Sequence, residues 1–82
     1  MKFAGQNAEK ITGPAIKIGA LVTSMEKPAR HDHVIQYLRG LGVSLSSVEY
    51  IEGFMTTEGF MDRIEAAQFV GKPGQLSTID LW

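Results

Sequence analysis

The sequence contains no cysteine, so it can form neither a disulfide nor a zinc site with thiolate ligands. No apolar run approaches the roughly 18–20 residues that a membrane-spanning helix needs, and the polar residues 5–10 do not resemble a signal peptide. With a formal net charge of -1 and scattered Lys and Arg, the chain has no strongly basic surface for general nucleic-acid binding. We therefore expect a cytoplasmic protein that neither enters a membrane nor binds nucleic acid in general.

The composition is that of a folded protein, with 44% hydrophobic and 21% charged residues in a chain of 82. Residues 1–13 mix Gly, Gln, Asn and charges without a clear period and end at Gly13-Pro14, which predicts a flexible or loosely docked N-terminal arm. Residues 14–82 then form a single domain. Because a domain this small buries a limited fraction of its surface, self-association is a natural source of added stability.

Two short runs rich in β-branched residues, 15–18 and 21–25, are separated by Gly19-Ala20, the spacing of a β-hairpin. The aromatic and β-branched run 48–57 predicts a further strand, with a bend at Gly53 and a turn at Glu58-Gly59.

Two helices are expected to cover these strands. The first spans 29–41, with Pro28 in its first turn and an apolar stripe at helical spacing. The stripe consists of His31, Val34, Ile35, Leu38 and Leu41. The second spans 63–70, because Asp62 and Glu65 form the aspartate version of a capping box, and we expect Ile64, Ala67 and Gly71 to form its apolar stripe. The predicted fold class is α+β, with a small antiparallel sheet of two to three strands packed with two helices.

The last residues carry more apolar surface than a solvated end favours, with Leu76, Ile79, Leu81 and Trp82 in one short segment. This tail is expected to dock either on its own domain or on a neighbouring copy. Leu81 and Trp82 are the predicted contacts of a homo-oligomer.

The cluster around the start of the first helix is the strongest candidate for a ligand site. Arg30 and His31 would add two cationic donors to a helix N-terminus, which already favours an anion such as a phosphate group. The alternative is structural: Arg30 pairs with a surface carboxylate, and His31 is a core-edge histidine with a satisfied hydrogen bond. His31 and His33 are about 200° apart on a helix and cannot easily share one metal, so we predict no metal site.

A second polar cluster surrounds the junction between the last strand and the second helix. Capping explains Asp62 and Glu65, but Arg63 in a first turn opposes the helix dipole unless an anion or a carboxylate meets it. Thr56 and Arg63 are therefore candidate ligand-binding residues alongside Arg30 and His31, and both arginines can face one ligand if the two helices start side by side. The sequence contains no Gly-x-Ser-x-Gly elbow or paired-carboxylate signature, so we assign no catalytic residue and no cofactor.

Several short motifs in a fixed order resemble a family of small proteins encoded by tailed phages and prophages. The matching segments between Ile11 and Trp82 are Pro28-Ala29-Arg30-His31, Val34-Ile35, Gly53-Phe54-Met55-Thr56-Thr57-Glu58-Gly59, Asp62-Arg63-Ile64-Glu65-Ala66-Ala67, Gly74-Gln75 and Asp80-Leu81-Trp82. The family pattern has Arg-His-His-Asp where this chain has Arg30-His31-Asp32-His33. It also has an Arg after the glycine of the second motif, whereas in this chain Gly59 is followed directly by Phe60. It also ends in Ser-Glu-Asp-Leu-Trp, against Thr78-Ile79-Asp80-Leu81-Trp82. The first of these departures leaves a role for His33 open.

Small phage proteins without catalytic motifs often act by binding, so the resemblance implies a protein that sequesters a phosphate-bearing nucleotide signal of host defence, in the cytoplasm of the host cell. One alternative is an inhibitor or adaptor that binds another protein through the apolar tail. The other is a small nucleotide hydrolase with His31 as acid or base.

Overall fold

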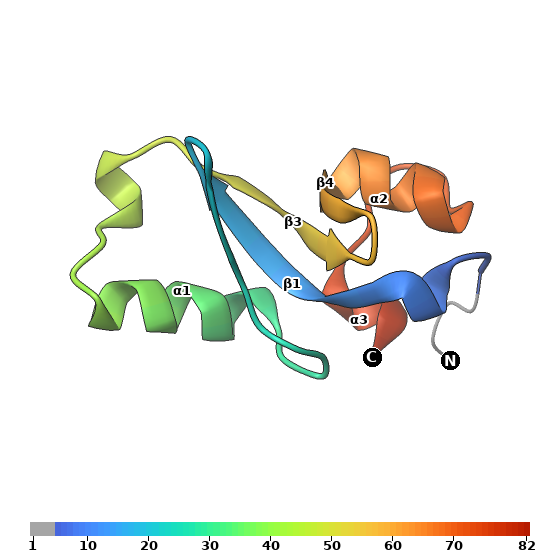
Figure 1. Ribbon diagram of the computed structural model, residues 1–82, viewed down its shortest axis with the longest axis horizontal. Helices are drawn as coiled ribbons and strands as arrows, with labels where there is room; N and C mark the ends of the chain where they lie inside the picture. Colours follow the sequence, from blue (N-terminus) through green and yellow to red (C-terminus); the bar gives the residue numbers. More distant parts are fainter. Residues whose placement is uncertain (1–4) are drawn as a thin grey trace.

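The computed structural model describes residues 5–82, so the first four residues of the predicted N-terminal arm lie outside the described residues. The elements are, in chain order, the 3-10 helix η1 (Ala8–Lys10), β1 (Ile11–Ile18), β2 (Leu21–Ser24), α1 (His31–Gly40), the 3-10 helix η2 (Leu45–Ser47), β3 (Ile51–Thr56), β4 (Gly59–Asp62), α2 (Arg63–Val70) and α3 (Thr78–Leu81) (Figure 1). Within this part of the chain, no helix is long and apolar enough to cross a membrane.

The four strands form one antiparallel sheet in the order β2-β1-β3-β4. The α+β class is confirmed, but the sheet is larger than the two to three strands expected, and a short third helix is added. The missed strand is β4, because the sequence pattern predicts a turn at Glu58-Gly59 and no strand after it. In the structure Gly59 pairs with Thr56, and its positive φ of 102° lets the chain reverse there.

The predicted hairpin is confirmed: β1 and β2 pair with Ile18 opposite Leu21, on either side of Gly19-Ala20. The predicted boundary after Gly13 is wrong, however, because β1 begins at Ile11 and both Ile11 and Gly13 are buried. A register shift between these two residues breaks the alternation of strand residues and puts Ile11 opposite Thr56. This bulge explains why the sequence shows no strand period there.

Helix α1 begins later than expected, at His31, because Arg30 has the extended backbone of an N-cap residue (φ -119°, ψ 167°). Pro28 therefore precedes the helix and does not lie in its first turn. The apolar stripe is confirmed for His31, Val34 and Leu38, which are buried, whereas Leu41 lies beyond the helix and is 64% exposed.

Helix α2 begins and ends where the sequence predicts. Asp62 Oδ1 accepts hydrogen bonds from the N–H groups of Ile64 and Glu65, and Glu65 Oε1 accepts one from the N–H of Asp62. The expected stripe was wrong in part, because Ile64 is 52% exposed. The buried residues of α2 are Ala66, Ala67 and Val70.

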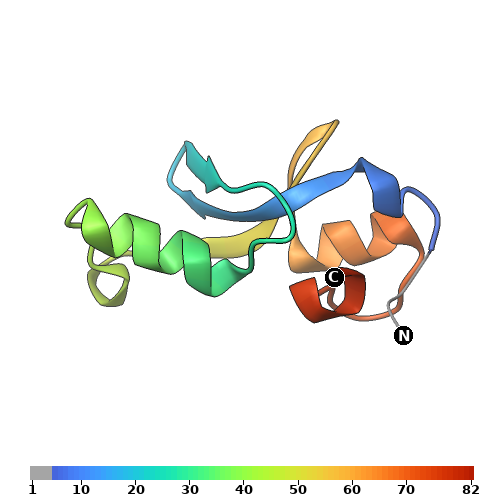
Figure 2. The ribbon, with the colours of Figure 1, turned by 90° about the horizontal axis from the view of Figure 1, so that it is seen from below.

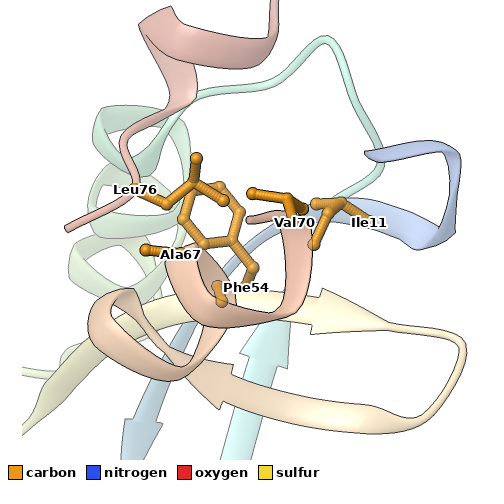
Figure 3. Close-up of a cluster of buried hydrophobic side chains, with 6 residues drawn as sticks. Ile11, Phe54, Ala67, Val70 and Leu76 are labelled. Atoms are coloured by element: carbon orange, nitrogen blue, oxygen red, sulfur yellow. The ribbon is translucent and has the colours of Figure 1, made fainter. Parts of the chain in front are cut away.

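Two hydrophobic clusters lie along the sheet, one under each group of helices. Near α2 the cluster contains Ile11, Phe54, Ala66, Ala67, Val70 and Leu76, most of which Figure 3 labels. Near α1 it contains Ile16, Val34 and Leu38. The molecule is elongated, 36 × 21 × 20 Å, with α1 toward one end and α2 and α3 toward the other (Figures 1 and 2). The starts of the helices face the middle of this arrangement.

Candidate functional site

A hollow of about 440 Å³ lies where the starts of the three helices come together. Every residue that lines it is a cap or first-turn residue of a helix, although the three segments are far apart in sequence. The lining residues are Arg30, His31 and Asp32 of α1, Arg63 of α2, and Ser77, Thr78 and Ile79 of α3. Three of the four predicted ligand-binding residues, Arg30, His31 and Arg63, are thus brought together.

Arg30 links α1 to the C-terminal tail. Its Nη1 donates to the hydroxyl of Thr78 at 3.3 Å, and its Nη2 donates to the main-chain oxygen of Trp82 at 2.5 Å. The structural alternative, in which Arg30 pairs with a surface carboxylate, is therefore not what the structure shows. Among residues 5–82, no Asp or Glu side chain forms an ion pair with Arg30. Because a guanidinium carries five N–H donors, some of them remain for a ligand.

The apolar tail docks on its own domain. Leu81 and Trp82 are partly buried against the cluster under α2, and the Trp82 ring meets the edge of Phe54 with centroids 6.3 Å apart. The indole N–H also donates to the main-chain oxygen of Ala29 at 2.7 Å. An oligomer contact through Leu81 and Trp82 remains a prediction, although contacts within the chain already cover much of both side chains.

His31 has the structural role that we considered as the alternative to ligand binding. It is 6% exposed, its ring meets the edge of Phe54, and its Nε2 lies 2.7 Å from the main-chain oxygen of Gly53. Because a carbonyl can only accept, Nε2 carries the proton in this bond. Burial lowers the pKa of His31 below its usual value of 6.5; the bond to Gly53 opposes this shift, and the charge of Arg63 adds to it.

Arg63 meets the carboxylate that its position in a first turn requires. Its Nη2 lies 2.5 Å from Oε1 of Glu52 on β3, and both side chains are about one quarter exposed. Its Nη1 donates to the main-chain oxygen of Leu76 at 3.4 Å, and the N–H of Leu76 donates to the main-chain oxygen of Arg63 at 3.0 Å. Arg63 therefore ties α2 to β3 and to the segment that leads into α3, while one side of it lines the hollow.

The start of α3 supplies hydroxyl groups that our sequence reasoning missed. Asp80 Oδ2 accepts hydrogen bonds from the N–H and the hydroxyl of Ser77, which forms a capping box. The bond from the Ser77 main chain holds the pKa of Asp80 below its usual value of 3.8, and Lys72, 3.8 Å away, acts in the same direction. The Ser-x-x-Asp spacing is a helix-start signal and could have been used to find this third contribution.

Two other residues do not line the hollow. Thr56 lies at the turn between β3 and β4, where its hydroxyl donates to the oxygen of Gly59 and accepts from the N–H of Glu58, each at 2.9 Å. His33, whose role was open, caps α1, because its Nδ1 accepts a hydrogen bond from the N–H of Arg30 at 2.9 Å. In the part of the chain from residue 5 onward, no three His, Asp or Glu side chains come close enough to hold a metal ion.

Comparisons with known proteins gave no match: no protein-family model matches the chain, and no curated protein or solved structure is significantly similar to it.

Proposed function

We propose that the chain binds a phosphate-bearing small molecule in the hollow between the helix starts, and that it acts by sequestering this ligand. One observation carries the proposal: Arg30 and Arg63 line the same hollow although they stand at the starts of different helices. Arginine binds phosphate through paired hydrogen bonds. The volume of about 440 Å³ suits a compound the size of a nucleotide, since small-molecule sites measure roughly 300–1,000 Å³.

The surroundings of the two arginines add support. Helix α1 begins at this hollow, so its positive dipole end favours a negatively charged ligand. The first-turn N–H groups of α2 already donate to Asp62, so α2 contributes through Arg63 only. Thr78 supplies a hydroxyl next to Arg30. Arg63 is paired with the carboxylate of Glu52, whereas Arg30 has no Asp or Glu partner among residues 5–82. Arg30 is therefore the stronger candidate for the main phosphate contact, with Arg63 as a second contact.

Sequestration and hydrolysis differ in what becomes of the ligand. His31 is nearly buried and its Nε2–H is already hydrogen-bonded, which favours binding without chemistry. The adaptor function through the apolar tail has less support, because Leu81 and Trp82 pack within the chain.

A release assay separates the three functions. The protein is incubated with a panel of nucleoside monophosphates, nucleoside triphosphates and cyclic dinucleotides, freed of unbound compound, denatured by heat, and the released compounds are identified by mass spectrometry. Recovery of an intact compound supports sequestration, and recovery of an altered product supports hydrolysis. Retention of no compound would contradict the proposal and favour a protein partner.

A further inference from the structure

A second feature of the fold lies at the β2 edge of the sheet and shares no residue with the hollow described above. In the sheet formed by residues 5–82, β2 has a neighbouring strand on one side only. Met25 and Lys27, which follow β2, donate their N–H groups to Pro14 and Thr12 on the chain of β1. Because the direction of main-chain groups alternates along an antiparallel strand, those of Leu21 and Thr23 also face β1. The N–H and C=O groups of Val22 and Ser24 therefore point outward from the free edge.

Strand β2 itself lacks the features that protect exposed strands, because Lys27 and Pro28 follow only after the strand ends at Ser24. Natural sheet edges are usually protected by Lys, by Pro or by a bulge, whereas β2 reads Leu-Val-Thr-Ser and pairs with β1 in an unbroken register. The opposite edge is different, since the N–H of Asp62 on β4 is already hydrogen-bonded to Glu65 and its side chain caps α2. The edge of β2 is thus the better template for an added strand.

Uncharged side chains surround the same edge. A hollow of about 450 Å³ runs between β2 and α1, and none of its lining residues is charged. The lining residues are Val22, Thr23, Ser24, Met25, Tyr37 and Leu41. Tyr37 and Leu41 are 53% and 64% exposed, and Leu21 on β2 is 68% exposed, so large apolar side chains collect beside unpaired main-chain groups.

We propose that β2 pairs antiparallel with β2 of a second copy of this chain, which joins the two sheets into one. In this arrangement Thr23 of both copies lies on the two-fold axis. The outward N–H and C=O groups of Val22 in one copy then form hydrogen bonds with those of Ser24 in the other. The same register sets Leu21 opposite Met25, an apolar pair. A second copy fits this surface because an uncharged edge brings no like charges together when it meets itself, and threonines opposite each other can hydrogen-bond.

The test places a charged side chain at Thr23, on the proposed two-fold axis. At high concentration, light scattering should give the wild type twice the 9.0 kDa mass of one chain. Thr23→Lys and Thr23→Glu each place two like charges opposite each other and should give the single-chain mass. An equal mixture of the two variants should regain the doubled mass. Thr57→Lys is the matched control, because Thr57 is exposed at the turn between β3 and β4, away from this edge, and it should leave the mass doubled.

A second measurement does not depend on variants that must fold. In the wild type, the main-chain N–H groups of Val22 and Ser24 should exchange with solvent more slowly as concentration rises, while that of Glu58 in the β3–β4 turn should not change. A single-chain mass for the wild type at hundreds of micromolar would overturn the proposal. A doubled mass without this protection, or a mixture of variants that stays monomeric, would overturn it as well.

Discussion

The indole N–H of Trp82 donates a hydrogen bond to the main-chain oxygen of Ala29, and these two residues are 53 positions apart in the sequence. The Trp82 ring also packs edge-on against Phe54 in the core. Because Arg30 donates in turn to the main-chain oxygen of Trp82, the tail and the start of α1 hold each other in place. One wall of the candidate site therefore depends on the docked tail.

Replacement of Trp82 should destabilise the fold through this link. Trp82→Phe keeps a ring against Phe54 but removes the indole N–H, which should lower the free energy of unfolding by about 1–2 kcal/mol. Trp82→Ala should cost more, about 3 kcal/mol, near the low end for a large aromatic residue because the side chain is only partly buried. Urea denaturation followed by circular dichroism measures both.

Trp82 is the single tryptophan, so its fluorescence reports tail docking directly. A docked tail within one chain predicts a spectrum that does not change with protein concentration.

Gly53 should tolerate no larger residue, because a Cβ there would lie 2.1 Å from the main-chain oxygen of Met61 and 2.8 Å from Cα of Asp62. Both contacts are with backbone of the paired strand β4, which cannot move aside cheaply. Gly53→Ala should therefore cost more than about 2 kcal/mol of unfolding free energy, beyond the usual range for surface changes. Gly40→Ala is the control: Gly40 ends α1 with open space around it, and there alanine should stabilise by about 0.5–1 kcal/mol. Equal effects in urea denaturation would contradict this reading of the β3–β4 pair.

The pH dependence of stability should carry a contribution from His31. Burial lowers its pKa in the folded state below 6.5, so the unfolded chain binds a proton more readily than the folded one. This contribution to stability is fully present above about pH 6.5 and is lost as the pH falls from there toward the lowered pKa. Wild type should therefore lose more unfolding free energy than His31→Gln between about pH 7.5 and about pH 5. Parallel pH profiles for wild type and His31→Gln would contradict the assignment.

Local signals in the sequence predicted the elements whose determinants are themselves local. The capping box at Asp62 and Glu65 placed the start of α2, and Gly19-Ala20 placed the hairpin, because both depend on backbone geometry within a few residues. Strand β4 was missed for the opposite reason. Its four residues, Gly-Phe-Met-Asp, carry no clear period, and they become a strand only by pairing with β3.

The sequence predicted only part of the candidate site: it found Arg30, His31 and Arg63, but neither the residues at the start of α3 nor the bonds that the two arginines form. Arg63 stood out because a first-turn arginine needs a negative partner, but nothing in the sequence identified that partner as Glu52 on β3. Thr56 looked like a polar site residue until tertiary structure put its hydroxyl in the β3–β4 turn. The convergence of three helix starts results from the way α2 and the tail fold back beside α1, which depends on contacts between residues far apart in sequence.

Arg30 offers the most direct test of phosphate binding, and its bonds to Thr78 and Trp82 decide how the test must be designed. With a nucleotide retained in the release assay, calorimetry should show that Arg30→Ala weakens binding by about 1.5–3 kcal/mol, the scale of a hydrogen bond to a charged group. The two bonds to the tail predict that Arg30→Ala also loses some stability. The affinities must therefore be compared at a temperature at which both proteins are fully folded.

Arg30→Lys separates the two effects. Lysine keeps the positive charge but cannot form the planar pair of hydrogen bonds, so it should recover part of the affinity and little of the bidentate contribution. Arg63→Gln should weaken binding less than Arg30→Ala, because Glu52 already holds that guanidinium. Arg39→Gln is the control, since Arg39 lies in the last turn of α1, away from the hollow, and should leave the affinity unchanged. If Arg30→Ala and Arg39→Gln bound the nucleotide equally well, the ligand would have to lie elsewhere on the molecule.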